Sequence, residues 1–375
     1  MVVYWTILAW TTFVGLTWKK WFIVRRKTLP GGRVEMLPTV FSLMIAMIPL
    51  IFIIGMRTEI ADTSIYISGF NDHSDISMKA FFKSLVNFAE KDPWFSSLKI
   101  IVKRIYPNAN FFFTVIATMQ VLFICITVGR YSAMPGVSLF LLIASTEIAY
   151  MFNGMRQFIA VTMLFAGYKL LVNKKYIPYI LLIAIAAQFH GTAYVMIIGL
   201  LFSFVKPWSK PMYFIIAGLT VTMVFIEPVL SGMQIFFEDS NYRKEMAALL
   251  NSEGVNIIRA FVALVPCVLG FFFRKNKALF SKREYAVAFN MSVLNAVFFI
   301  AASIVGGNLM ARFAEYFTIY QLLTYPALFK CCFREGKERN IIVLAFGVLY
   351  CIWFWYQMDV NWGIKYISDV LGWYF

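Results

Sequence analysis

Several charged side chains of this 375-residue sequence lie inside or beside long apolar runs, where an ionised group is costly and needs a reason. Three are arginines, Arg57, Arg156 and Arg312, whose planar guanidinium groups bind phosphate oxygens bidentately. Two further residues, His190 and Asp62, could take a proton from an attacking hydroxyl group. The residue types therefore predict a site that binds a phosphate or diphosphate beside a general base.

Other polar residues of the same regions are candidates for binding substrate. They are Glu59, Tyr66, Glu147, Asn153, Gln157, Glu315 and Tyr316. Each also has a structural interpretation, because an arginine can pair with a carboxylate such as Glu147 and a histidine can be a packing residue. No aspartate-rich metal motif appears, so we expect neither a metal nor a cofactor, and arginines would neutralise a leaving diphosphate.

The elements that must position these residues are membrane-spanning helices. The chain is 61% hydrophobic and 14% charged, whereas soluble domains carry roughly 25% charged residues. Apolar runs of near-spanning length recur from end to end, so we predict an all-α bundle of about twelve transmembrane helices. The expected spans are 2–18, 36–56, 111–129, 136–153, 156–172, 176–189, 191–205, 211–227, 256–273, 285–304, 310–329 and 340–357.

The charge pattern gives the expected orientation. The net charge of +15 is concentrated in short loops between apolar runs, which is typical of membrane topology and argues against a nucleic-acid partner. If the 19–33 loop is cytoplasmic, the other basic loops, including 274–283 and 330–339, are cytoplasmic too. Both termini and most candidate site residues then face outward.

Three regions are expected to shape the outer face of a single transmembrane domain covering 1–375. The loop 57–110 contains two amphipathic stretches, 78–90 and 93–105, that suit helices lying in the membrane interface. The second long outer loop is 228–255. The spans around 188–191 are short, so their turn, with His190, should be recessed into the membrane.

Four ordered motifs of the chain resemble the EpsG family of bacterial exopolysaccharide proteins. They are 57–66 (RTEIADTSIY), 153–160 (NGMRQFIA), 189–193 (FHGTA) and 312–317 (RFAEYF), spread over about residues 36–330. The pair Ala314-Glu315 departs from the family pattern by adding a charge.

The resemblance implies a polysaccharide polymerase of the O-antigen-polymerase type in the bacterial plasma membrane. Such proteins join oligosaccharide repeat units carried on undecaprenyl diphosphate, at the outer face, and their fold is similar to the C-type integral-membrane glycosyltransferases. The implied partners are that lipid-linked oligosaccharide, membrane lipid and other polysaccharide-assembly proteins. We expect an inverting, metal-independent displacement in which Arg156 and Arg312 bind the diphosphate, Arg57 assists, and His190 or Asp62 is the base.

Three other functions fit the same residues. A flippase of the lipid-linked unit would need a polar pathway to both faces, which the one-sided charge argues against. A membrane O-acyltransferase would need an acyl donor from the cytoplasm. A glycan ligase shares the donor chemistry, so the sequence does not separate it from a polymerase.

Overall fold

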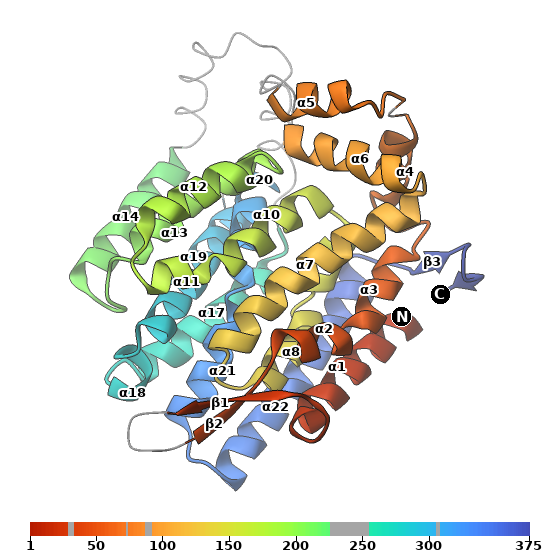
Figure 1. Ribbon diagram of the computed structural model, residues 1–375. Coiled ribbons are helices and arrows are strands. Elements are labelled where there is room, and N and C mark those ends of the chain that lie inside the picture. Colours follow the sequence, from red (N-terminus) through yellow and green to blue (C-terminus); the bar gives the residue numbers. More distant parts are fainter. Residues whose placement is uncertain (29–33, 73, 87–91, 226–254, 305–307) are drawn as a thin grey trace.

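The apolar runs fold into helices that pack side by side in one bundle, shown in Figure 1. The structure, a computed structural model, describes residues 1–28, 34–72, 74–86, 92–225, 255–304 and 308–375. The expected outer loop 228–255 lies, apart from its last residue, outside the described residues. The described part is mostly helical, which confirms the predicted predominance of helix.

The described residues up to Val172 contain eleven helices, and the residues after them continue the same pattern. The first are α1 (Val2–Trp21), α2 (Val40–Ala46), α3 (Ile48–Gly55), α4 (Thr63–Asn71), α5 (Met78–Val86), α6 (Pro93–Ile105), α7 (Ala109–Tyr131), α8 (Pro135–Ala144), α9 (Glu147–Phe152), α10 (Met155–Ala166) and α11 (Tyr168–Val172). Then come α12 (Tyr176–Ala187), the 3-10 helix η1 (Gly191–Val195), α13 (Met196–Phe202), α14 (Lys210–Val224), α17 (Ile257–Phe272), α18 (Lys277–Phe280), α19 (Arg283–Ile304), α20 (Asn308–Thr318), α21 (Gln321–Cys332), α22 (Lys337–Trp355) and the π-helical turn η2 (Tyr356–Asn361).

Within the described residues, four helical stretches are long and apolar enough to cross a membrane. They are Ala109–Tyr131, Met155–Val172, Arg283–Ile304 and Lys337–Asn361. Other apolar helices are shorter, for example α12 with 12 residues and α17 with 16 residues. The chain is therefore a membrane protein, and the number of about twelve spans stays a prediction.

Several expected spans are interrupted. The region 36–56 begins as a strand, β2 (Val34–Pro38), which pairs antiparallel with β1 (Val24–Thr28), and then forms α2 and α3. Pro49 stands in the first turn of α3, where its missing N–H group is tolerated, so the helix restarts there. Similarly, 136–153 breaks at Thr146, whose φ of 69° is left-handed, and 310–329 breaks between α20 and α21.

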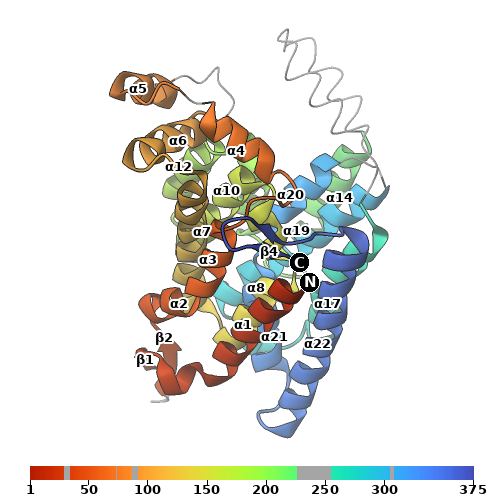
Figure 2. The same ribbon diagram turned by 90° about the vertical axis from the view of Figure 1, so that its right-hand side faces the viewer.

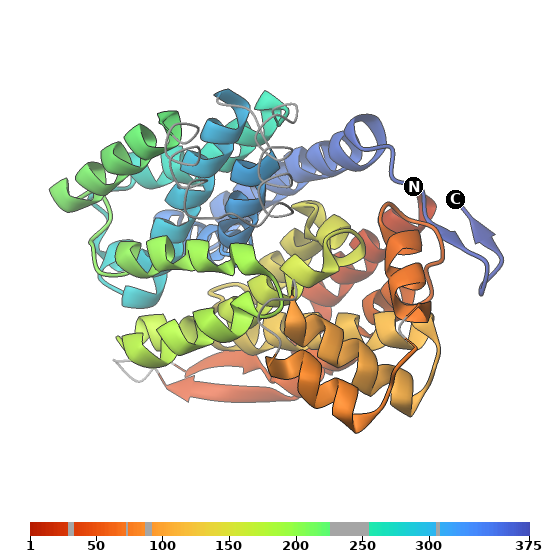
Figure 3. The same ribbon diagram turned by 90° about the horizontal axis from the view of Figure 1, so that it is seen from above.

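Basic and amphipathic segments occupy opposite ends of the bundle in Figures 1 and 2. The β1–β2 hairpin, α18 and the start of α22 lie at the lower end in these views, whereas α4, α5 and α6 lie at the upper end. The two termini lie near each other at mid-height, where the small hairpin of β3 (Ile367–Ser368) and β4 (Trp373–Tyr374) contacts the segment after α3. Figure 3 looks down on the end that carries α5 and α6.

Helices form over both amphipathic stretches, and they pack together. Ser84 Oγ of α5 lies 2.7 Å from Ser97 Oγ of α6, and Trp94 Nε1 donates to the carbonyl oxygen of Leu85 at 3.2 Å. Lys103 Nζ donates to the carbonyl of Phe70 at 2.8 Å, which joins α6 to α4. The three helices therefore form a layer on the upper end of the bundle.

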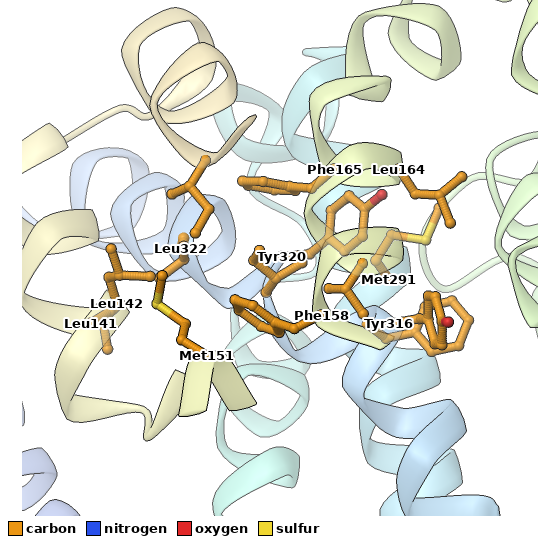
Figure 4. Packing of buried hydrophobic residues seen from close by; sticks show 14 of the residues in the cluster. Leu141, Leu142, Met151, Phe158, Leu164, Phe165, Met291, Tyr316, Tyr320 and Leu322 are labelled. Carbon is orange, nitrogen blue, oxygen red and sulfur yellow. The ribbon is translucent and has the colours of Figure 1, made fainter. Parts of the chain in front are cut away.

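Helix α10 is the central element beneath this layer. Most of its side chains are buried, and Figure 4 shows Phe158 and Phe165 packed near Tyr320 and the residues around it. The rings of Phe165 and Tyr320 meet edge to face at 5.2 Å. Such close packing fixes the position of the residues at the start of α10, where the polar site begins.

Candidate active site

Arg156 lies in the first turn of α10, at the upper end of the buried core. The chain enters this helix through Gly154, whose φ of 75° is accessible to glycine without strain. The Arg156 side chain is 35% exposed, and its Nη1 lies 2.8 Å from Asp92 Oδ2. This arginine therefore joins a buried carboxylate on one side and remains accessible on the other.

Asp92 belongs to the described segment that leads into α6. Its backbone is left-handed, with φ 55° and ψ 55°, a conformation that aspartate adopts more readily than most residues. Its carboxylate makes no capping hydrogen bond to α6. The same Oδ2 atom that binds Arg156 lies 3.7 Å from His190 Nδ1, so the carboxylate faces both side chains.

His190 lies in the turn between α12 and η1, at the position where the sequence predicts a turn. Its backbone N–H donates to the carbonyl of Ala186 at 3.1 Å, and η1 starts at the next residue. The residue is 7% exposed, yet neither ring nitrogen has a hydrogen-bond partner among the described residues. Buried polar atoms are nearly always bonded, so both nitrogens of this imidazole are available to water or to a substrate.

Trp94 fixes the turn of His190 against the start of α6. The Trp94 backbone N–H donates to the carbonyl of Gln188 at 3.1 Å, and its ring meets Phe189 edge to face at 6.1 Å. These contacts set the spacing of Asp92 and His190, which are 98 residues apart in the chain. They also bring the start of the amphipathic helix α6 to the turn that follows α12.

Tyr66, on α4, approaches the same group from another side. Its hydroxyl interacts electrostatically with Arg156, and its ring meets that of Phe95 edge to face at 6.3 Å. Burial raises the pKa of the Tyr66 hydroxyl, and the charge of Arg156 opposes this rise. Asp62, at the start of α4, interacts electrostatically with Tyr66, so it belongs to the edge of the site.

Helix α20 completes the arrangement. The Tyr316 hydroxyl lies 3.1 Å from Thr192 Oγ1 and interacts electrostatically with Asp92 and Arg312. Gln157 Nε2 donates to the backbone carbonyl of Arg312 at 2.5 Å, which ties α10 to α20. The Arg312 residue is exposed. The exposed Arg312 thus lies on the helix whose Tyr316 interacts electrostatically with both Asp92 and Arg312.

Arg57 is placed differently from the other predicted arginines. It is 0% exposed, and its guanidinium group lies 4.2 Å from the ring centre of Phe113. The group donates to the carbonyls of Ile54 and Phe152 and to Thr63 Oγ1. All three of its nitrogens are therefore engaged inside the protein, and the structure does not offer it to a substrate.

Glu147 and Glu315 form a second buried polar cluster. Glu315 Oε1 lies 2.8 Å from Arg259 Nη2, which also donates to the Tyr150 hydroxyl at 2.9 Å. Glu147 is 1% exposed, and neither of its carboxylate oxygens has a hydrogen-bond partner among the described residues. A cavity of about 20 Å³ lies beside Glu315 and Arg259, large enough for one water molecule.

The two remaining predicted residues lie at exposed positions. Asn153 is exposed at the end of α9, close in sequence to Arg156. Glu59 is exposed and interacts electrostatically with Tyr374 near the C-terminus. Neither makes a contact with the Asp92 carboxylate among those found in the described part of the chain.

Asp92 was not among the site residues predicted from the sequence. The only local signal was an acidic residue directly before Pro93 at the start of an amphipathic helix, which equally suits a helix cap. Its function depends on partners that lie far away along the chain.

The chain was also compared with known proteins. No curated protein and no solved structure matches it significantly. The EpsG family matches residues 40–368, a range that includes α2 to β3 and every residue of the arrangement described above. This confirms the resemblance drawn from the four motifs: the chain belongs to the EpsG family, whose members are membrane proteins associated with exopolysaccharide biosynthesis.

Proposed function

We propose that this protein is a polysaccharide polymerase that joins oligosaccharide repeat units carried on undecaprenyl diphosphate. The observation that carries the proposal is the meeting of Arg156 and His190 at Asp92. Accessible arginines bind diphosphate oxygens, and a buried imidazole with free nitrogens can accept a proton. Family membership supports a role in polysaccharide biosynthesis.

The proposed reaction is a single displacement. A hydroxyl group of the incoming lipid-linked unit attacks the anomeric carbon of the growing chain and gives its proton to His190. The bond between that carbon and the diphosphate oxygen breaks, and the diphosphate leaves with the electron pair. Arg156 and Arg312 stabilise the negative charge on the leaving group, so no metal is required. Attack opposite the leaving group inverts the anomeric configuration.

The proposed location is the outer face of the bacterial plasma membrane, with both termini outside. This orientation is supported by the basic β1–β2 hairpin and α18, which lie at the end of the bundle opposite α6. The amphipathic helices α5 and α6 would then rest in the outer interface, where a lipid-borne diphosphate resides. We further propose a fold similar to the C-type integral-membrane glycosyltransferases.

The test uses cells that lack the native gene and carry a variant in its place. The His190→Gln variant should accumulate single lipid-linked repeat units at the outer face, whereas the wild type and the Arg130→Ala control make long polymer. Arg130 is an exposed arginine at the far end of α7, which makes it a matched control. Normal polymer in the His190→Gln variant would contradict the proposal.

The same cells separate a polymerase from a flippase. Externally added glycosidase digests accumulated units only if they have already crossed the membrane. Units that accumulate on the cytoplasmic side would show that the protein moves the lipid-linked unit rather than extends it.

A further inference from the structure

One carboxylate oxygen, Asp92 Oδ2, faces two side chains with different tasks in the proposed reaction. Arg156 Nη1 is at hydrogen-bonding distance, 2.8 Å, whereas His190 Nδ1 is at 3.7 Å, too far for a hydrogen bond. In the structure this oxygen therefore bonds the group that would bind diphosphate and leaves the proposed base without an orienting partner.

Backbone and ring contacts hold the segments of Asp92 and His190 together, whereas Arg156 belongs to a different helix. The contacts of Trp94 with Gln188 and Phe189 join the start of α6 to the histidine turn. Arg156 reaches the carboxylate from α10 through a long side chain that is 35% exposed. The arginine is therefore the partner that can leave without moving backbone.

A diphosphate would draw Arg156 away from Asp92. It offers several charged oxygens in the bidentate geometry that a guanidinium group prefers, against a single oxygen of Asp92. The Asp92 side chain is only 4% exposed, so losing its arginine would leave a buried charge uncompensated. The imidazole of His190, whose Nδ1 lies 3.7 Å from the same oxygen, can compensate that charge.

We propose that Asp92 is the positioning residue of His190, and that the donor diphosphate activates it by taking Arg156. The inference rests on the proposed polymerase function. Once Asp92 accepts a hydrogen bond from Nδ1–H, the lone pair lies on Nε2, which takes the proton of the attacking hydroxyl. The resulting imidazolium then stands beside a carboxylate that stabilises it. The base is thus aligned only when a donor is present.

The other polar groups around this carboxylate are compatible with such an exchange. The Tyr316 hydroxyl on α20 interacts electrostatically with this carboxylate and with Arg312, and the Tyr66 hydroxyl on α4 interacts electrostatically with Arg156.

The experiment observes the imidazole directly by nitrogen NMR. The chain has two histidines, so the His73→Gln variant of the full chain, labelled with ¹⁵N-histidine, gives the signals of His190 alone. The probe is undecaprenyl diphosphate, the leaving group of the proposed reaction, which cannot react further. Its addition should move the ¹⁵N signal of Nδ1 to the position of a protonated, hydrogen-bonded nitrogen.

Two further substitutions in the His73→Gln protein test whether Asp92 positions His190. Asp92→Asn should abolish the response to the probe. Arg156→Ala should show the shifted signal before any probe is added, because the carboxylate is already released. If Asp92 only anchors α10, the His190 signal in both variants should equal that of the His73→Gln protein, with and without the probe. That result overturns the proposal.

An activity measurement separates this inference from the function on which it rests. Asp92→Asn should lower kcat for polymer extension roughly 100-fold with little change in KM, and Asp92→Glu should restore part of it. Polymer extension without any probe-dependent signal at His190 overturns the positioning role alone. A probe-dependent signal in a wild-type protein that makes no polymer overturns the polymerase function alone.

Discussion

The Arg156 guanidinium group bonds the carboxylate of Asp92 at 2.8 Å, although 64 residues separate them in the chain. This contact brings the first turn of α10 to the start of the amphipathic helix α6. It gives a partly exposed arginine and the imidazole of His190 one carboxylate oxygen in common.

Arg156→Ala should abolish polymer extension, because the leaving diphosphate loses a bidentate partner. Arg156→Lys keeps the charge but not the planar fork, so we expect it to retain about one hundredth of the activity. Initial extension rates of purified protein, normalised to protein amount, measure both effects. Equal activity of the lysine and wild-type proteins would show that charge alone suffices.

Arg312→Ala should lower the extension rate by about 100-fold or more while leaving thermal stability unchanged. Its side chain is at an exposed position, and its fixed contact with α10 is made by the backbone carbonyl, which alanine retains. Comparison with Arg130→Ala controls for the loss of a positive charge elsewhere. Full activity of the Arg312 variant would remove it from the donor site.

Arg57→Ala should destabilise the protein without changing its affinity for the donor. The substitution leaves the carbonyls of Ile54 and Phe152 without a donor and opens a cavity against Phe113, at a cost of about 2–5 kcal/mol. Thermal unfolding in detergent and the KM for the lipid-linked donor give the two readouts. A raised KM at wild-type stability would instead support the expected third diphosphate contact.

The two buried glutamates should respond differently to loss of charge. Glu315→Gln leaves Arg259 without its counter-ion, which costs about 3–5 kcal/mol in a buried site. Glu147→Gln removes no hydrogen bond found among the described residues, so it should leave the melting temperature unchanged or raise it. Unfolding curves of the two single variants, measured side by side, check this contrast. Equal losses in both would contradict it.

Gly15→Val should displace α1 from α8. A Cβ atom at Gly15 would lie 2.7 Å from the carbonyl oxygen of Gly136, so the two helices contact each other through their backbones. We expect a loss of about 1–3 kcal/mol, visible as a lower melting temperature. Gly218→Val is the matched control, since nothing lies within 4 Å of a Cβ atom there. Equal stability of both variants would be incompatible with this packing.

Much of the helical pattern was predictable from apolar run length. The expected span 111–129 is α7 and 285–304 is α19, each extended by two residues at one end or both. The interruptions at Thr146 and between α20 and α21 were not predicted, because hydrophobicity does not reveal where packing forces a helix to restart. The pairing of strand 24–28 with strand 34–38 was not predicted either, because a short basic hairpin has no alternation of apolar and polar residues.

The candidate site was predictable in residue type but not in pairing. Arg156, His190 and Tyr66 were all singled out, and the structure brings them together with Asp92. Arg57 has the same residue type and a similar place in the pattern, yet it is enclosed by aromatic rings and carbonyl groups. Sequence position beside an apolar run does not distinguish an arginine that serves a substrate from one that holds two helices together.

The backbone hydrogen bond from Trp94 to Gln188 makes the site sensitive to the surrounding bilayer. If α6 lies among lipid headgroups, a change in lateral pressure or in bilayer thickness that displaces α6 will also displace the turn that carries the His190 imidazole. We therefore expect turnover to vary with acyl-chain length and headgroup size in reconstituted vesicles, so that the lipid environment tunes this protein mechanically as well as supplying its substrate.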